Sequence, residues 1–259
     1  MNIAAALKDL GIASRRITSL SGGALSDVYR VDTSRAVFAA KTGPHVAVEA
    51  RMLRAMAAAG APVPRVINEA PNLILLEFLH DAPCGHDSWE AAGAALRDMH
   101  ATTGDASGWP EDYAFGAVDV VNTPCSDWPE FWAERRLRPF AQTFPDLAPR
   151  IDTACQRLRG ILPDQACGLL HGDMWSGNLL ATTRGVMMID PACYHGHGEV
   201  DLAMLDLFSE VPPALAAGYG PLEPGWQERR RIYQIFPALV HLALFGGSYR
   251  NLVDRLLPT

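Results

Sequence analysis

LHGDMWSGNLL (residues 170–180) is the most informative stretch of this sequence. Asp173 and Asn178 lie five residues apart in it, and Asp190 follows twelve residues after Asn178, at the end of a short apolar run. Any one of these side chains, taken alone, is most often a turn or helix cap, because Asp and Asn bond readily to nearby backbone amides. Three of them at these spacings indicate a site built from oxygen-bearing side chains.

The pattern H-x-D-x-x-x-x-N, followed by an Asp after a short strand, has the spacing of the catalytic and metal-binding residues of kinases. Phosphoryl transfer needs a carboxylate that accepts the proton of the attacking hydroxyl, and it needs Mg²⁺ on the nucleotide phosphates. Mg²⁺ prefers hard oxygen ligands, which an amide and a second carboxylate supply. The sequence therefore predicts phosphoryl transfer from ATP with Mg²⁺ as cofactor.

A candidate phosphate loop lies upstream, at Gly22 and Gly23, just before an expected strand at residues 28–31. Small residues let backbone amides approach phosphates closely, although a plain hairpin turn explains the same glycines. The chain contains no Walker A motif, which would read G-x-x-x-x-G-K-[ST]. We expect Gly22 and Gly23 to contact ATP.

Lys41 ends a second expected strand at residues 37–41, where the phosphate-binding lysine of a kinase-like fold stands. Glu49 is the only acid in the helix expected over residues 46–59. The alternative is two unrelated surface charges. We expect Lys41 and Glu49 to pair, so that the ammonium group is oriented toward the nucleotide.

The remaining pattern predicts an α+β protein, with a sheet-rich first third and a helix-rich remainder. Residues 73–78 form an apolar run typical of a buried strand, and D-S-W-E at 87–90 resembles a capping box that opens a helix. Further strands are expected at residues 169–170 and 186–189, and further helices at residues 128–140, 147–161, 202–208 and 228–244. We place the boundary between an N-terminal nucleotide-binding lobe and a C-terminal catalytic lobe at residues 1–79 and 80–259.

The strand over residues 73–78 would run into the connection between the lobes. We expect backbone groups near Glu77, Phe78 and Leu79 to hydrogen-bond adenine, which requires no particular side chain. An ordinary core strand is compatible with the same sequence.

Composition excludes several classes of protein. The net charge of −7 argues against a general nucleic-acid binder, and no apolar run is long enough to span a membrane. Five cysteines without a C-x-x-C pair indicate free thiols in a reducing compartment. We expect a cytoplasmic monomer that acts on a small molecule, without nucleic-acid or membrane partners.

Three further segments resemble the fructosamine kinase, or ketosamine-3-kinase, family, which belongs to the aminoglycoside-phosphotransferase-like kinases. They are SDWPEFWAERRLRPF (126–140), IDPACYHGHGEVDLAM (189–204) and EPGWQERRRIYQIFPALVHLALFGGSY (223–249), and HGDMWSGN (171–178) fits the same family. The resemblance implies a two-lobed protein-kinase-like fold, with a small antiparallel sheet in the N-terminal lobe and a larger, mostly helical C-terminal lobe.

The resemblance also implies roles for individual residues. Asp173 is the catalytic base, Asn178 and Asp190 hold Mg²⁺, and Lys41 and Glu49 form the pair that positions ATP. His171 and Asp201 support the catalytic loop.

Three more residues are candidates for contact with the substrate. Trp175 offers an aromatic face to a sugar or an amine, although a Trp that braces the catalytic loop is the alternative. His197 and Glu199 line the acceptor site or only shape the segment after Asp190. No zinc site follows from His195 and His197, because further ligands are missing nearby.

The resemblance implies that the acceptor is O3 of a fructosamine-type adduct, with a role in deglycation. An aminoglycoside or a choline-like amine is the first alternative. The even balance of five acids and five arginines over residues 202–259 weakly disfavours a polycationic aminoglycoside. A pseudokinase without turnover is the alternative from another class, and the presence of all four predicted polar residues argues against it.

Overall fold

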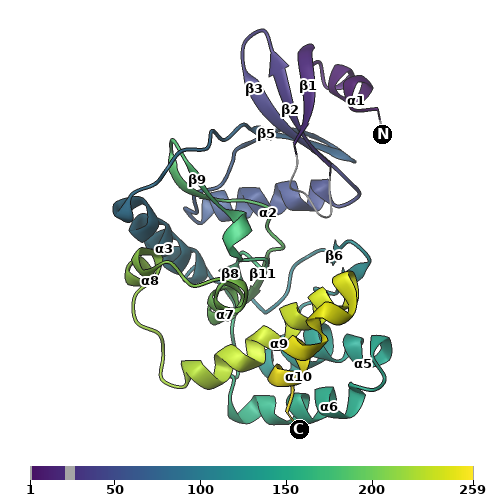
Figure 1. Ribbon diagram of the computed structural model, residues 1–259, viewed down its shortest axis with the longest axis vertical. Helices are drawn as coiled ribbons and strands as arrows, with labels where there is room; N and C mark the ends of the chain where they lie inside the picture. Colours follow the sequence, from purple (N-terminus) through teal and green to yellow (C-terminus); the bar gives the residue numbers. More distant parts are fainter. Residues whose placement is uncertain (1, 21–26, 259) are drawn as a thin grey trace.

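The computed structural model describes residues 2–20 and 27–258, and Figure 1 shows its ribbon. A sheet lies at one end of the molecule, and most of the helices gather at the other end. The predicted α+β class is confirmed. Gly22 and Gly23 lie outside the described residues.

The N-terminal sheet is antiparallel and has the strand order β1-β2-β3-β5-β4. Its strands are β1 Ser14–Leu20, β2 Asp27–Thr33, β3 Val37–Thr42, β4 Val66–Ala70 and β5 Leu73–Glu77. The strands expected from residues 28–31, 37–41 and 73–78 are therefore present. β1 and β4 carry no comparable apolar run, and the sequence analysis missed both.

Helices cover both faces of this sheet. Side chains alternate between the two faces of a strand, so the apolar run of β5 serves two cores. Leu73 and Leu75 pack with Leu7 of α1 (Ile3–Asp9), whereas Ile74 and Leu76 join the larger core that contains α2 (Val46–Ala58). β5 is therefore buried between two hydrophobic layers.

The helix α2 follows the expected range closely. Its Ala, Met and Leu residues are good helix formers, and Met52, Leu53 and Met56 are buried. The helix ends before Gly60, which has a φ of +84°, a conformation that glycine adopts without strain.

The next helix, α3 (His86–His100), begins earlier than expected. Gly85 occupies the N-cap position and provides no side-chain cap, while Asp87 already lies in the first helical turn. The capping-box prediction at residues 87–90 was wrong, because the helix begins two residues before the position that the motif assigns to its start.

The stretch expected to be one helix over residues 128–140 is divided. It consists of α4 (Trp128–Phe131), a π-helix (Trp132–Leu137) and α5 (Pro139–Thr143). The π-helical turn carries Arg136, which is completely buried. Short π-helical segments are rare and are frequent at functional sites.

Helices account for most of the remaining chain. They are α6 Ala148–Arg157, α7 Glu199–Phe208, α8 Pro213–Tyr219, α9 Trp226–Phe245 and α10 Arg250–Leu256, with 3₁₀ turns at Leu158–Gly160 and Gly246–Tyr249. Of these, α8 and α10 were not expected. No helix among the described residues is both long and apolar enough to cross a membrane. All five cysteines are free thiols.

Three two-stranded ribbons complete the fold. β8 (Gly168–Leu170) pairs with β11 (Tyr194–Gly196), β9 (Leu179–Thr182) pairs with β10 (Gly185–Met188), and β6 (Tyr113–Phe115) pairs with β7 (Val118–Val120). The first two ribbons bring the loop over residues 171–178 beside the loop over residues 189–193. The predicted polar residues of both loops therefore meet.

Candidate active site

A buried carboxylate, that of Asp201, holds the start of the loop over residues 171–178. Asp201 accepts hydrogen bonds from the backbone N–H of His171 at 2.7 Å and of Gly172 at 2.9 Å. Gly172 has a φ of +80°, and a Cβ there would lie 2.0 Å from the carbonyl oxygen of Ala192. The turn therefore needs glycine, and its position is set by groups on α7 and on the neighbouring loop.

The ring of His171 joins the two loops. The ring is buried, its Nε2 lies 2.9 Å from the carbonyl oxygen of Ile189, and its Nδ1 accepts a hydrogen bond from the Asp173 N–H at 3.2 Å. Burial lowers the pKa of His171, so the ring is neutral and Nε2 carries the proton that it donates to Ile189. His171 and Asp201 thus both hold the segment that presents Asp173.

Asn178 and Asp173 face each other across the loop. The Asn178 Nδ2 group donates to the Asp173 carbonyl oxygen at 2.8 Å and to its Oδ2 at 3.1 Å. With both N–H groups directed at Asp173, the amide oxygen of Asn178 faces the other way. It has no hydrogen-bond partner among the described residues, which leaves it available as a hard oxygen ligand.

Lys41 stands between two carboxylates. Its Nζ lies 2.7 Å from Glu49 Oε2 and 3.1 Å from Asp190 Oδ1. Lys41 and Glu49 are buried, whereas the Asp190 side chain is 39% exposed and opens into the cleft. The contact joins β3, α2 and the loop after β10 at one point.

Burial and charge set the protonation of these groups. Burial raises the pKa of Asp173 to about 7, and the charge of Asp190 adds to this effect, while the hydrogen bond from Asn178 lowers it. Burial also raises the pKa of Glu49 to about 7, against the lowering effect of Lys41. Burial lowers the pKa of Lys41, but Glu49 and Asp190 together raise it above its ordinary value, so the ammonium group stays charged.

A cleft of about 600 Å³ lies above these residues. It is lined by eight of the predicted site residues that have described positions, namely Lys41, Glu49, Glu77, Phe78, Leu79, Trp175, Asn178 and Asp190. The apolar side chains of Ala39, Leu53, Leu76 and Ile189 form part of the same wall. Such a mixture of apolar wall and a few convergent polar groups is typical of a small-molecule site.

The connection after β5 forms one edge of the cleft. The side chain of Glu77 bonds to Arg184 at 2.7 Å and to Arg65 at 3.3 Å, so its carboxylate is already paired. Within residues 2–20 and 27–258, the backbone groups of Phe78 and Leu79 have no backbone hydrogen-bond partner. They remain available to the edge of a planar base.

Trp175 is 41% exposed and is one of the few large apolar side chains at the surface. A Cβ at Gly177 would lie 2.2 Å from its indole ring, so the ring packs directly on that glycine. The indole is therefore held in place on one side and open to the cleft on the other.

The other two candidate substrate contacts lie away from this cleft. Neither His197 nor Glu199 is among the described residues that line the cleft. Glu199 is buried and binds Arg229 through both carboxylate oxygens at 2.7 Å, and His197 Nδ1 lies 2.8 Å from the hydroxyl of Tyr233. We therefore leave both out of the substrate site, since their polar atoms are engaged in packing α7 against α9.

Sequence reasoning missed the second layer of support beneath the catalytic loop. His100, at the end of α3, contacts Asp201 Oδ2 through Nε2 at 2.9 Å and the Tyr219 hydroxyl through Nδ1 at 2.9 Å. The three residues lie far apart in the sequence, and no spacing connects them. Only the packing of α3 against α8 brings them together.

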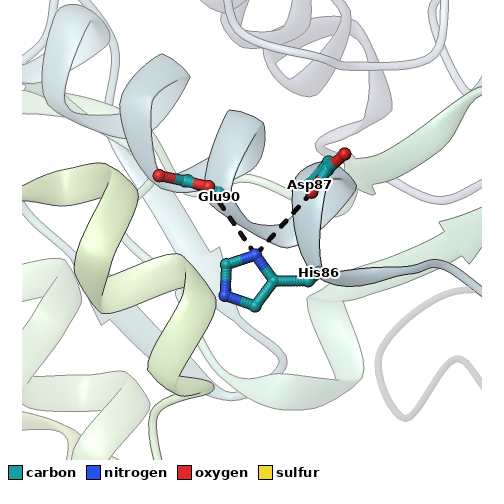
Figure 2. A group of neighbouring side chains, drawn as sticks. All are labelled: His86, Asp87 and Glu90. Carbon is teal, nitrogen blue, oxygen red and sulfur yellow. Dashed lines mark ion pairs between the residues drawn. The ribbon is translucent and has the colours of Figure 1, made fainter.

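A group of side chains able to bind a metal lies at the start of α3, where His86, Asp87 and Glu90 point toward one another (Figure 2). All three are exposed, and the His86 Nδ1 lies 3.8 Å from Asp87 and 3.6 Å from Glu90. Exposed acids near a histidine are common without any ion, so we assign no metal to this group.

The fold and the cleft define a phosphotransferase of the kinase type: a charged lysine on a sheet, a paired glutamate on a helix, and an Asp–Asn–Asp set on two adjoining loops. The sequence model of the fructosamine kinase family matches residues 3–259. The chain belongs to this family and is an ATP-dependent kinase.

Individual relatives agree. A protein of Synechocystis described as a probable ketoamine kinase is 37% identical, with 92% of this chain and 88% of that protein covered. A rice protein-ribulosamine 3-kinase is 29% identical over 91% of this chain and 75% of its own length.

Solved structures show the same fold. A Thermobifida fusca protein provisionally described as a fructosamine-3-kinase has a TM-score of 0.89 and 28% identity, covering 98% of this chain and 96% of that one. An aminoglycoside phosphotransferase has a TM-score of 0.69 at 15% identity, covering 98% of this chain and 96% of its own, which is a likeness of fold alone.

Proposed function

We propose that the chain transfers the γ-phosphoryl group of ATP to a hydroxyl group, O3, of a ketosamine such as a fructosamine or ribulosamine. The observation that carries the proposal is the convergence of Lys41, Asn178 and Asp190 on one cleft, beside Asp173. The family and the ketoamine and ribulosamine kinases among the relatives support the substrate class. Phosphorylation at O3 makes such an adduct labile, which is consistent with deglycation.

Nucleotide binding is assigned to the cleft. The free backbone groups of Phe78 and Leu79 suit the edge of adenine, and the ammonium of Lys41 suits the phosphates. Asn178 and Asp190 offer an amide oxygen and a carboxylate, the hard donors that Mg²⁺ prefers, so these residues fit the ion. When bound, Mg²⁺ supplies positive charge to the phosphates of ATP.

Asp173 is assigned to the acceptor hydroxyl. A carboxylate with a pKa of about 7 is a better proton acceptor than an ordinary aspartate, and about half of it is ionised at neutral pH. As the hydroxyl oxygen attacks the γ-phosphorus, its proton passes to Asp173 and the bond to the leaving ADP oxygen breaks. The hydrogen bond from Asn178 to Asp173 Oδ2 holds the carboxylate in a fixed orientation for this step, and a second bond from Asn178 holds the backbone carbonyl of Asp173.

Trp175 is assigned to the sugar-amine. Its indole is fixed against Gly177 and exposes one face, which suits the C–H surface of a sugar and an adjacent ammonium group.

The proposal is tested by measuring ADP release with fructosyl-lysine, ribulosyl-lysine, free fructose, choline and kanamycin as acceptors. We expect turnover with one or both lysine adducts, with phosphate placed on O3 by NMR. Activity on kanamycin or choline alone would reject the ketosamine assignment while leaving the kinase assignment intact.

A further inference from the structure

A short ribbon outside the cleft reaches from the helical part of the chain to α2. We call residues 111–122, which contain β6 and β7, the hairpin strap. The strap begins at Glu111 and ends at Asn122, and in Figure 1 its strand β6 stands beside one end of α2. No residue of the strap was singled out by its sequence.

The base of the strap is held by Arg136. This side chain is completely buried, and its hydrogen-bond acceptors among the described residues are two backbone carbonyls and one amide oxygen, with no carboxylate. Its Nη1 donates to the carbonyl oxygen of Val121 at 2.7 Å and its Nη2 donates to Asn122 Oδ1 at 2.7 Å. The guanidinium lies 4.2 Å from the centre of the Tyr194 ring, an aromatic contact that helps to offset the cost of burying the charge.

Asn122 then ties the two ends of the strap together. It is completely buried, its Nδ2 donates to the Glu111 carbonyl oxygen at 3.1 Å, and its backbone N–H donates to Asp112 Oδ1 at 2.7 Å. All of these hydrogen bonds join residues between Glu111 and Arg136, which lie outside the N-terminal sheet. The position of Glu111 is therefore fixed by the helical part of the protein and not by the sheet.

The first residues of the strap contact α2. Arg51 donates from Nε to Glu111 Oε2 at 2.9 Å and from Nη2 to Glu111 Oε1, a two-point contact of guanidinium and carboxylate. The ring of Tyr113 lies 5.6 Å from that of His45, the residue just before α2. Both contacts fall on the first half of the helix.

That half of α2 also carries Glu49. Glu49 is two residues before Arg51, points inward, and holds Lys41 against Asp190. Its carboxylate is buried with only Lys41 as a described side-chain partner, so the Glu49 contact by itself gives α2 little hold on the helical region. A second attachment at the surface of the same turn adds to the hydrophobic core that α2 shares with the helical region.

We propose that Glu111 is a positioning residue for the nucleotide site: by binding Arg51 it sets the position of α2, and thus of Glu49 and Lys41, relative to Asp190. The inference rests on the proposed function, because it assigns Lys41 to the phosphates. It predicts that the Arg51–Glu111 pair affects nucleotide binding although neither residue lines the cleft.

The test uses charge reversal with a matched control on the same helix. Arg51→Glu and Glu111→Arg each break the pair, and the double variant restores it with the charges exchanged. Arg54→Glu is the control, because Arg54 has a similar exposure and binds Glu69 of β4 at 2.9 Å, within the N-terminal sheet. The affinity for the Mg²⁺ complex of a non-hydrolysable ATP analogue is measured by calorimetry, and the unfolding midpoint is recorded for every variant.

We expect each single reversal to weaken nucleotide binding and raise the KM for ATP by about threefold to tenfold, the range of coupling between contacting charges. The KM for the acceptor should not change, and the exchanged pair should return to within about twofold of the wild type. Arg54→Glu should bind nucleotide as the wild type does. Equal effects of Arg51→Glu and Arg54→Glu, or no recovery in the exchanged pair, would overturn the proposal.

The readout separates this inference from the proposed function. Nucleotide binding is measured without an acceptor, so the strap can be tested even if the acceptor panel shows that ketosamines are not the substrates.

Discussion

At Asp190 the backbone adopts a φ of 55°, the only positive value at a non-glycine residue in the described chain. Such a conformation costs free energy and is maintained only where the surroundings enforce it, which makes it a marker of a functional position. Asp and Asn tolerate it better than other residues, so an Asp is suited to this place by its backbone as well as by its charge. The backbone conformation therefore marks Asp190 independently of its spacing from Asn178 in the sequence.

Two substitutions at Asp190 separate the contribution of its charge from that of its backbone conformation. Asp190→Asn keeps a side chain that tolerates the backbone but removes the negative charge, and we expect the Mg²⁺-dependent part of ATP affinity to fall by about tenfold or more. Asp190→Ala should also lower the free energy of unfolding by about 1 kcal/mol, because alanine disfavours this φ. Calorimetry with and without Mg²⁺ is the measurement, and an unchanged metal dependence in Asp190→Asn would remove the residue from the ion site.

A second residue-scale prediction concerns Asp173. Asp173→Asn preserves size and hydrogen bonding but cannot accept the proton, so we expect turnover to fall by about 10²-fold or more. Mg²⁺-ATP binding should stay within about threefold of the wild type, since the assigned ion ligands and Lys41 are untouched. The exposed residue Asp119 provides a control, as Asp119→Asn should leave both quantities unchanged. Undiminished turnover in Asp173→Asn would contradict the assignment.

The sequence predicted some contacts of individual side chains and missed others. The positions of Lys41 and Glu49 followed from the elements that carry them, a strand end and a single acid in one helix. No such rule covered His197 and Glu199, which follow the motif closely in sequence but face α9. Arg229 stands in a run of three arginines, which is typical of an exposed helix face, but it is buried with Glu199. Glu199 and Arg229 are thirty residues apart, so the local sequence around either residue does not predict that they pair.

Element boundaries were predicted best where local chemistry decides them. Gly60 ends α2 and the apolar run of β5 is buried on both faces, as expected from the residues themselves. The π-helix over Trp132–Leu137 was missed, because Arg136 is fixed there by Val121 and Asn122, which belong to a distant ribbon. The short strands β9 and β11 were missed for the same reason, since pairings of three or four residues depend on tertiary contacts.

The contact of α3 with α7 gives an element-scale prediction. Burial alone would raise the pKa of Asp201. The hydrogen bonds from His100 and the loop amides lower it by more than burial raises it, so the pKa of this carboxyl lies below its ordinary value. A carboxyl with a depressed pKa stabilises the fold at pH values above its unfolded pKa of about 4, and this contribution is lost as the pH falls through the folded value. Acidification below about pH 4 should therefore loosen the catalytic loop.

His100→Leu tests this contact. It leaves a buried carboxylate with one donor fewer, and we expect the free energy of unfolding at pH 7 to fall by about 2–3 kcal/mol. The loss of stability on acidification should also begin at a higher pH than in the wild type, because the pKa of Asp201 rises. Tyr219→Phe removes only the hydroxyl that contacts His100 and should cost about 1 kcal/mol. Urea unfolding at several pH values is the measurement, and identical pH profiles of wild type and His100→Leu would contradict the role given to His100.

The whole molecule combines a cleft between two regions with a shared core. The division at residues 79 and 80 describes where the chain passes from sheet to helices, but one hydrophobic cluster runs from α2 through β8 and β10 to α9 and α10. The backbone N–H of Met188 also donates to the carbonyl oxygen of Pro62 at 2.7 Å. Composition and motifs predicted the two regions, whereas the continuity of their core depends on long-range packing that no local pattern encodes.

A shared core implies that both regions unfold together, and the tryptophans make this testable. All six tryptophans lie at or beyond residue 89, so their fluorescence reports only the helical region. Met56 is completely buried in the shared cluster on α2, and Met56→Ala should lower the free energy of unfolding by about 2–5 kcal/mol. Because the unfolding is cooperative, the urea midpoint followed by tryptophan fluorescence should fall together with that followed by circular dichroism. Arg54→Ala, an exposed change on the same helix, should change the free energy of unfolding by no more than about 0.5 kcal/mol. A Met56→Ala variant whose fluorescence midpoint equals that of the wild type would show that the sheet region and the helical region unfold separately.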